Sequence, residues 1–216
     1  MKVSVVVVTY RRLTSLERIL QAWLLETPDV WLCDCSKEGF KTELPINIVR
    51  CIPDPGNKAR HAVATMTTGD LVIKADDDIL PYPGIVADFV AHANSYPDTI
   101  MGIHGRIFHG ADYYHKTRYY GAKSIDKPLR VDFVGVMTCT PRKFLAMDLI
   151  GCDSAIEDLF WQMQCYPRAR KLIIKTDKFM NLPESKDSQR LCGTPESRNF
   201  RNAYYVKWYN ANYAKK

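Results

Sequence analysis

The chain has 216 residues, 46% of them hydrophobic and 25% charged, and carries a formal charge of +6 at pH 7. This length supports one α/β domain with a full core and is marginal for two, and the composition excludes disordered and fibrous proteins. The charge is scattered along the chain, so it suits a small anion such as a nucleotide as well as a polynucleotide.

Neither a secretory leader nor a membrane anchor is predicted. The apolar run 3–8 is too short for a signal-peptide core, and no stretch approaches the roughly 18 apolar residues of a transmembrane helix. The seven cysteines are an odd set without the paired CxxC spacing of a zinc site, which predicts free thiols in a reducing compartment. Cys33 and Cys35 are expected to pack rather than to bind metal. We therefore expect a cytoplasmic protein.

The first hundred residues predict alternating strands and helices. The β-branched run 3–8 is typical of a central parallel strand covered on both faces, and the periodicity of 11–25 predicts an amphipathic helix after it. Pro81 and Pro83 are expected to end a strand over 71–75. The other elements expected here are strands over 30–35 and 46–51 and helices over 58–66 and 85–95.

The second half predicts a less regular order of elements. Residues 109–130 are polar, aromatic and without period, which favours a long excursion over one face. The remaining expectations are strands over 100–108, 131–140 and 172–176, helices over 142–149, 156–165 and 200–213, and a loop over 185–194. The last helix is aromatic-rich and is a candidate lid.

Polar residues follow three of the predicted strands at the point where each strand ends. Asp76, Asp77 and Asp78 (the acidic triplet) come directly after the buried strand LVIKA. Ligands of parallel α/β sheets bind beyond these strand ends, and three adjacent carboxylates repel one another unless a cation neutralises them. Oxygen ligands of this kind favour Mg²⁺ or Mn²⁺. A solvated acidic turn or a helix N-cap cluster is the structural alternative.

Three segments of the chain, in this order between residues 3 and 165, resemble the GT-A glycosyltransferases, particularly family 2-like and exostosin-like members. They are VSVVVVTYRR, PGNKARHAVATMTTGDLVIKADDDI and IEDLFWQM. The small size also resembles compact modules of large algal DNA viruses, for which the host cytoplasm would be expected. The resemblance implies a single GT-A (Rossmann-like) α/β domain over 1–216, with a mostly parallel central sheet flanked by helices. Its parts would be a nucleotide-binding half (1–100), an acceptor half (101–184) and a C-terminal loop and helix (185–216).

The resemblance implies metal-dependent transfer of a hexose or deoxyhexose from a UDP-sugar to a hydroxyl of a glycan or glycoprotein, with inversion of configuration. The metal would be Mn²⁺ or Mg²⁺, bound directly by Asp78, and no nucleic acid partner is implied. The implied nucleotide and donor residues are Thr9, Tyr10 and Arg12 beside the base, Asp34 on uracil, Lys58 and Arg60 on the diphosphate or sugar, Asp76 near ribose or sugar, and Asp77 through water or sugar hydroxyls.

On the acceptor side, the resemblance implies that Asp158 is the general base, with Glu157 beside it. Trp161 would either stack on an acceptor sugar or lie in the core, and Gly135 only faintly echoes the family's glycine motif. No histidine follows Asp158 to serve as a further metal ligand. Ordinary solvated charges remain the alternative for Glu157 and Asp158 and for Lys58 and Arg60. Three arginines of the tail, Arg190, Arg198 and Arg201, could close over the diphosphate, but solvated charges are the favoured interpretation.

Three other functions fit parts of the sequence. A nucleotidyltransferase acting on sugar phosphates would share the α/β fold and the strand-end carboxylates, but the first loop, TYRRLTS, lacks a phosphate-binding glycine. A nuclease or nucleic-acid-binding protein is compatible with the charge, but no recognition helix or RNA-binding motif is present. A non-catalytic sugar- or nucleotide-binding module remains open if Asp158 lies outside the site.

Overall fold

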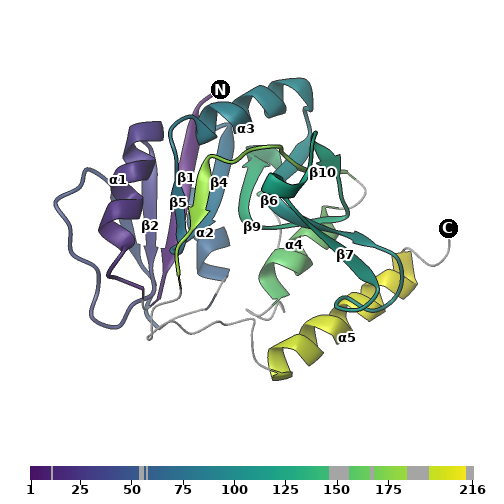
Figure 1. Ribbon diagram of the computed structural model, residues 1–216. Coiled ribbons are helices and arrows are strands. Elements are labelled where there is room, and N and C mark those ends of the chain that lie inside the picture. The colour runs from purple at the N-terminus through teal and green to yellow at the C-terminus, as the bar shows by residue number, and fades with distance from the viewer. Residues whose placement is uncertain are drawn as a thin grey trace.

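The structure is a computed structural model that describes residues 1–10, 12–53, 56, 58–145, 156–165, 168–183 and 195–212. In these residues a large mixed sheet is flanked by helices on both faces (Figure 1). The helices are α1 (Leu16–Glu26), α2 (Lys58–Met66), α3 (Ile85–Ser95), α4 (Glu157–Gln164) and α5 (Pro195–Asn212). The strands are β1 (Val3–Thr9), β2 (Val30–Asp34), β3 (Asn47–Arg50), β4 (Leu71–Asp76), β5 (Ile79–Pro81), β6 (Thr99–Phe108), β7 (Thr117–Gly121), β8 (Leu129–Arg130), β9 (Phe133–Pro141), β10 (Arg170–Ile173) and β11 (Phe179–Asn181).

The large sheet is parallel in its N-terminal part and mixed beyond it. Its strand order is β3-β2-β1-β4-β9-β6-β10-β8, with β7 attached to β6. The neighbours β3, β2, β1 and β4 all run parallel, so their carboxyl ends share one edge. Strand β9 then lies antiparallel between β4 and β6. The predicted α/β class is confirmed, and the parallel pairing is concentrated in the half that was expected to bind the nucleotide.

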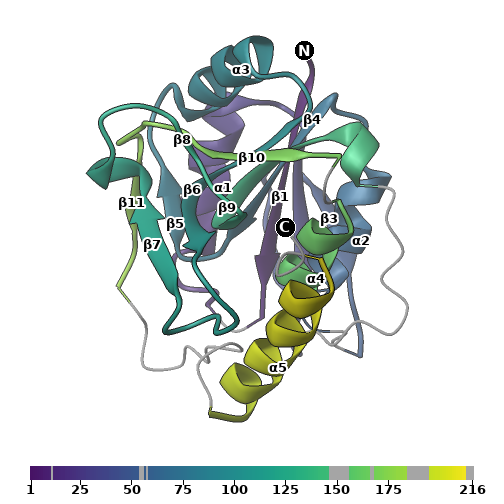
Figure 2. The ribbon, with the colours of Figure 1, turned by 90° about the vertical axis from the view of Figure 1, so that its right-hand side faces the viewer.

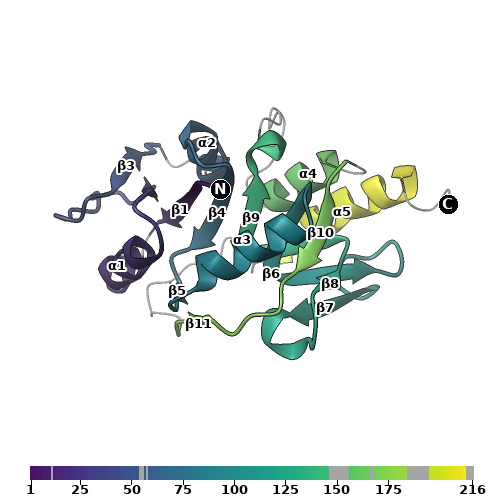
Figure 3. The same ribbon diagram turned by 90° about the horizontal axis from the view of Figure 1, so that it is seen from above.

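The β-branched run of β1 forms a strand because both of its faces are covered. Val5, Val6 and Val7 are fully buried. Figure 3 shows α1 and α3 on one face of the sheet and α2, α4 and α5 on the other. Trp23 of α1 packs in the main core cluster with Val5 and Val7, while Val63 of α2 packs with Val6 on the opposite face. Full burial of a valine side chain stabilises the fold by about 1.5–3 kcal/mol.

The excursion predicted over 109–130 contains regular structure. Residues Thr117–Gly121 form β7, which pairs antiparallel with the C-terminal part of β6, and Leu129–Arg130 form β8. The prediction missed β7 because its sequence, TRYYG, has no alternation of buried and exposed positions: none of its residues is buried. The hairpin of β6 and β7 extends past the sheet toward α5, as Figure 2 shows from the side.

Helix α5 packs on the second half of the sheet through aromatic side chains. Tyr205 is fully buried, and its ring lies 4.8 Å from that of Phe108 in β6 and 5.5 Å from that of Tyr113. The ring of Phe160 in α4 lies 5.5 Å from that of Tyr204. The two contacts of Tyr205 are edge-to-face, an arrangement that stabilises by about 0.5–1.5 kcal/mol beyond the area buried. The C-terminal helix is therefore an integral layer of the second half of the chain.

Three smaller differences from the predicted elements concern boundaries. Residues Ile79–Pro81 continue as β5 and pair with β11, so Pro81 ends a second short strand rather than the first. The helix expected over 142–149 is a 3-10 turn at Arg142–Phe144, and its remainder lies outside the described residues. Helix α5 begins before the predicted start at residue 200. None of the described helices has the length and hydrophobicity required to cross a bilayer.

Candidate active site at the carboxyl edge of the parallel strands

The acidic triplet lies at the shared carboxyl edge of the parallel strands. Asp76 is the last residue of β4 and lies beside Val8 of β1 in the parallel register. The side chains of Asp76, Asp77 and Asp78 are 36%, 13% and 29% exposed. The sequence predicted this position because a buried strand runs directly into the triplet. The three carboxylates are therefore close to solvent but only partly hydrated.

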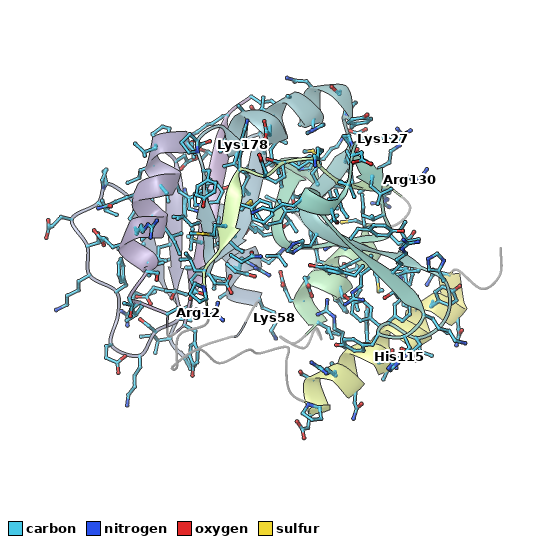
Figure 4. All side chains as sticks on the ribbon, viewed as in Figure 1. Arg12, Lys58, His115, Lys127, Arg130 and Lys178 are labelled. Carbon is cyan, nitrogen blue, oxygen red and sulfur yellow. The ribbon has the colours of Figure 1, made fainter. Side chains whose placement is uncertain are left out.

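Two arginines and a threonine bind the triplet. Arg12 forms ion pairs with Asp78 and, at 3.5 Å, with Asp77, whose second oxygen accepts a hydrogen bond of 2.8 Å from the hydroxyl of Thr9. Thr9 is itself buried and orients Asp77, and its predicted contact with the base stays a prediction. Figure 4 labels Arg12 and Lys58 at the same edge, with Lys58 at the beginning of α2.

Burial raises the pKa of both Asp76 and Asp77 to about 6. Loss of hydration is the largest cause in each case, and the neighbouring carboxylates add to it. Arg60 opposes the shift at Asp76, whereas Thr9 and Arg12 oppose it at Asp77. The shift means that the arginines do not fully compensate the negative charge at this edge. Additional positive charge would be stabilised there.

The triplet fits a divalent cation only through a small number of protein ligands. Among the described residues, the carboxylates do not form a compact group of three ligand atoms. Asp78 has the geometry of a single ligand: it is part-exposed, lies at the open edge and has only Arg12 as its side-chain partner in the described contacts. Mg²⁺ and Mn²⁺ commonly take one or two carboxylates together with phosphate oxygens and water. The donor set therefore fits Asp78 as the metal-binding residue when a diphosphate is present.

Asp158, at the start of α4, is held by an arginine of the C-terminal helix. Arg201 donates from Nη1 to Oδ1 at 2.9 Å and from Nη2 to Oδ2 at 3.0 Å, and the backbone N–H of Leu159 donates to Oδ1 at 2.8 Å. Arg201 also donates to the hydroxyl of Tyr113 at 3.1 Å. Burial opposes ionisation, but the charge and hydrogen bonds of Arg201 outweigh it and lower the pKa of Asp158. Asp158 is therefore an ionised carboxylate in a fixed orientation.

Arg60 joins the two acidic segments. It pairs with Asp76 through Nη1 and approaches Glu157 through Nη2 at 3.4 Å. Arg60 is only 9% exposed, and its pKa is raised because the charges of Asp76 and Glu157 outweigh the effect of its burial. Because Glu157 and Asp158 are consecutive, this contact places the start of α4 next to the end of β4. The guanidinium of Arg60 contacts two carboxylates of the protein, and its predicted contact with a diphosphate stays a prediction.

A buried polar cluster lies behind Arg60. Glu157 is 1% exposed, and its Oε1 lies 4.0 Å from both Nζ of Lys74 and Nδ1 of His61. Nζ of Lys74 also lies 3.7 Å from the centre of the Trp161 ring. Loss of hydration lowers the pKa of Lys74 to about 8 and, together with the charge of Lys74, that of His61 to about 3. The cluster therefore supports the site from inside the fold.

Three of the predicted site residues, Glu157, Trp161 and Asp34, lie in the interior of the fold. Glu157 is covered by Arg60 and cannot reach an acceptor. Trp161 is fully buried, and its indole N–H donates to the carbonyl of Phe144 at 2.7 Å, so it is a core residue and not a stacking platform. Asp34 is also fully buried, and its carboxylate is used by the protein. Its four donors are the backbone N–H groups of Ser36 and Phe40, the hydroxyl of Ser36 and Nη1 of Arg50.

The residue after Gly135 carries backbone strain. Gly135 is buried in β9 opposite His104 of β6, at a shift in the strand register, and Val136 has a φ of +67°. A positive φ is a genuine outlier for a β-branched residue, and such strain concentrates at binding and catalytic sites. Gly135 itself offers no exposed surface to an acceptor. Val136 is half-buried, so its side chain is the one that is partly exposed at this backbone irregularity.

Sequence reasoning missed two residues of the site and undervalued a third. Lys74 lies within an apolar strand and His61 within a short helix, and nothing in their spacing indicates that they meet Glu157. Arg201 was considered mainly as a solvated charge, and its pairing with Asp158 bridges 43 positions. Lys58 and Tyr10 lie near the edge as expected, and Tyr10 packs on the cluster that contains Cys33. Arg190 lies outside the described residues.

Comparisons with known proteins identify the fold. No family model matches the sequence, and no curated protein matches it significantly. Solved structures do match. S. aureus TarS 1-349 in complex with UDP-GlcNAc superposes with a TM-score of 0.64 and 13% identity, over 98% of this chain and 73% of that one. GalNAc-T7 with UDP, GalNAc and Mn²⁺ superposes with a TM-score of 0.70 and 14% identity, over 99% and 49%.

Both neighbours are GT-A glycosyltransferases, and the chain has their fold. At this level of identity the likeness establishes the fold alone. The chain spans about half of the GalNAc-T7 chain and 40% of a longer S. aureus TarS structure. The predicted GT-A architecture is thus confirmed by structural similarity.

Proposed function

We propose that the protein is a glycosyltransferase that moves a hexose or deoxyhexose from a UDP-sugar to a hydroxyl of a glycan or glycoprotein, with inversion at the anomeric carbon. One observation carries the proposal: the guanidinium of Arg60 contacts both Asp76 and Glu157. This contact brings Asp158 to the edge of the sheet that holds the acidic triplet. The fold is shared with proteins solved with UDP, UDP-GlcNAc and Mn²⁺, which supports a UDP-sugar as donor.

The two halves of the chain would divide the work. Residues 1–100 contain the four parallel strands whose carboxyl ends meet, and they would bind the nucleotide. Residues 101–184 contain the strained Val136 and Asp158, and they would bind the acceptor. The segment 185–216, of which the structure describes 195–212, would contribute Arg201. Its helix would orient the catalytic carboxylate in addition to any role as a lid.

Asp158 would act as the general base. The acceptor oxygen would form a bond to the anomeric carbon while its proton passes to Oδ2 of Asp158. The bond between that carbon and the diphosphate oxygen would break, and UDP would leave with the electron pair. The bonds from Arg201 and Leu159 use three of about four lone-pair positions of the carboxylate, so Oδ2 retains one for this proton. A low pKa is compatible with the role because the hydroxyl becomes acidic as the new bond forms.

Asp78 would hold a divalent cation, Mn²⁺ or Mg²⁺, together with the diphosphate. When bound, such an ion would offset the negative charge that develops on the departing UDP. Arg12 would then exchange its pairing with Asp78 for the diphosphate, to which a guanidinium binds through two parallel hydrogen bonds. Lys58, at the N-terminus of α2 on the same edge, would add positive charge.

Calorimetry with UDP, with and without Mn²⁺, tests this proposal. Wild-type protein is expected to bind UDP tightly only with Mn²⁺. Asp78→Ala should abolish the Mn²⁺-dependent part, whereas Asp158→Asn should keep UDP binding and lower transfer by about 100- to 10,000-fold. Asp126→Asn is the matched control, because Asp126 is exposed and adjoins Lys127, which Figure 4 places far from the edge. Absence of Mn²⁺-linked UDP binding would refute the proposal.

A non-catalytic sugar- or nucleotide-binding module is the second candidate. It is favoured by the bidentate pairing of Asp158 with Arg201, which lowers the basicity of the carboxylate. This candidate predicts Mn²⁺-linked UDP binding without transfer or hydrolysis of any UDP-sugar. A screen of UDP-sugars for released UDP in the presence of Mn²⁺ separates the two candidates, since only a transferase would release UDP.

A further inference from the structure

Three cysteine thiols converge on the face of the sheet covered by α2, at the carboxyl ends of β2 and β3. Sγ of Cys33, in β2, lies 3.9 Å from Sγ of Cys35 and 3.7 Å from Sγ of Cys51, and all three sulfur atoms lie within 4.8 Å of one another. Together they are named the thiol cluster. No other group of three His, Cys, Asp or Glu ligand atoms in the described part of the chain is as compact.

The parallel pairing of β2 and β3 explains the convergence. Cys33 and Cys35 are two positions apart in an extended segment, so their side chains lie on the same face. Asp34 pairs with Arg50, and the backbone N–H of Cys51 donates to the carbonyl of Asp34 at 2.9 Å, which places Cys51 beside them. The carboxylate of Asp34 lies on the opposite face, where it accepts its four hydrogen bonds. The cluster face therefore presents sulfur and no carboxylate from this segment.

We infer that the thiol cluster is a binding site for a thiophilic metal ion, with Zn²⁺ as the expected ligand. Zinc–sulfur bonds are about 2.3 Å long, so the sulfur atoms of a tetrahedral site lie about 3.8 Å apart. The two short separations in the cluster bracket that value. Binding replaces three S–H protons with three Zn–S bonds, and the protons pass to solvent. A water molecule would complete the tetrahedron from the side of the half-buried Cys51.

The surroundings select a soft ion over a hard one. The cluster packs with apolar residues of β1, β4 and α2, namely Val6, Val72, Ala59, Val63 and Ala64. Mg²⁺ and Mn²⁺ require oxygen ligands, and these apolar side chains supply none, whereas thiolates select zinc and related ions. The pKa of Cys33 is raised by its hydrogen bond to Cys35 and by burial, and burial raises the pKa of Cys51. The thiols of Cys33 and Cys51 are therefore poorly reactive at neutral pH, which disfavours a disulfide.

A metal ion here would fix the edge of the nucleotide-binding half. Strand β3 is the terminal strand of the sheet and exposes three of its four residues. A metal ion bound by both Cys33 of β2 and Cys51 would attach the end of this strand to β2. Ligand binding to the folded state alone stabilises it in proportion to the logarithm of ligand concentration. The inference does not depend on the proposed transferase activity.

The test is a Cd²⁺ titration of fully reduced, chelator-treated protein, followed by the ultraviolet absorption of cadmium–thiolate bonds. Wild-type protein is expected to saturate at one equivalent, to lose the band on addition of excess Zn²⁺, and to melt at a higher temperature with Zn²⁺. Cys33→Ser, Cys35→Ser and Cys51→Ser should each weaken or remove the band. Cys139→Ser is the matched control, because Cys139 is a buried free cysteine outside the cluster. Asp78→Ala should also retain the band, which separates this site from the proposed active site.

A second measurement avoids reliance on variants that fold poorly. Alkylation of the wild-type thiols followed by peptide mass spectrometry should show that one equivalent of Cd²⁺ slows the modification of Cys51, which is half-buried, whereas Cys33 and Cys35 are already buried without metal. The absence of a saturable band, an unchanged band in Cys51→Ser, or a Cys51 alkylation rate that Cd²⁺ does not change would overturn the inference. Formation of a disulfide within the cluster in air, with no metal binding by the reduced protein, would overturn it as well.

Discussion

Replacement of Arg201 by methionine tests whether the ion pair with Asp158 fixes the ionised carboxylate. The two side chains are 7% and 27% exposed, and the pair has bidentate geometry. Removal of one partner of a buried pair costs about 3–5 kcal/mol, because the other charge is left uncompensated. Since Asp158 keeps some exposure, we expect Arg201→Met to lower the free energy of unfolding by about 2–3 kcal/mol at pH 7.5. In a chain of this size that is a fall in Tm of about 4–12 °C.

The pH dependence distinguishes lost charge pairing from lost packing. In the wild type, the folded-state pKa of Asp158 is lowered, so its contribution to stability is fully present above the unfolded pKa of about 3.9 and is lost only as pH falls through the lower folded value. In Arg201→Met, burial dominates and raises the pKa, so the defect is relieved as pH falls from 7.5 toward 5. The difference between the two proteins should narrow by up to about 1.4 kcal/mol per pH unit.

Urea unfolding of wild type and Arg201→Met at several pH values measures this difference. The raised pKa values of Asp76 and Asp77 are common to both proteins, so their effect on stability largely cancels in the comparison. Arg198→Met is the control, because Arg198 lies on the same helix but is exposed. A difference that stays constant from pH 7.5 to 5, or one no larger than that of the control, would refute the reasoning.

Three further predictions concern the acidic triplet and the buried residues Trp161 and Asp34. The pKa of Asp76 and of Asp77 is raised to about 6, so protons compete with cations for these carboxylates below that pH. The Mn²⁺-linked affinity for UDP, measured by calorimetry, should therefore fall between pH 7 and 5.5 and stay nearly constant from pH 7 to 8. Trp161→Phe should reduce stability by about 1–3 kcal/mol through the lost buried hydrogen bond and leave the acceptor KM unchanged; a raised KM would restore a role in acceptor binding. Asp34→Asn should weaken the pairing with Arg50 and lower the free energy of unfolding by about 1–3 kcal/mol, with UDP affinity retained. A selective loss of UDP affinity at unchanged stability would instead support the predicted contact of Asp34 with uracil.

The strands and the position of the triplet were predictable because local sequence determines them. A β-branched run such as that of β1 is stable only when covered on both faces, and a parallel sheet collects the residues that follow its strands at one edge. The placement of Asp76, Asp77 and Asp78 follows from these two facts. The resemblance then identified Asp158 as the partner carboxylate, which the structure brings to the same region through Arg60.

The partners of these residues were not predictable, because they depend on contacts between distant segments. Lys74 is one polar residue in a buried strand, and the sequence does not reveal that Glu157 and the face of Trp161 surround it. Whether Trp161 is exposed depends on the packing of α4 and not on its own periodicity. The burial of Asp34 likewise depends on the loop that follows it, whose backbone N–H groups supply two of its hydrogen bonds. Nucleotide-facing and structural carboxylates look alike in sequence.

The position of β9 between β4 and β6 has a consequence for folding during synthesis. Both neighbours are made before β9, so from the emergence of β6 until residues Phe133–Pro141 are available each has an unpaired edge. These strands are apolar and largely buried in the final sheet, and exposed edges of this kind promote association between chains. Chains truncated before residue 133 are therefore expected to aggregate, whereas chains extending past β9 have the sheet closed at its centre. Insertion of β9 thus closes the centre of the sheet, and β10 later covers the remaining edge of β6.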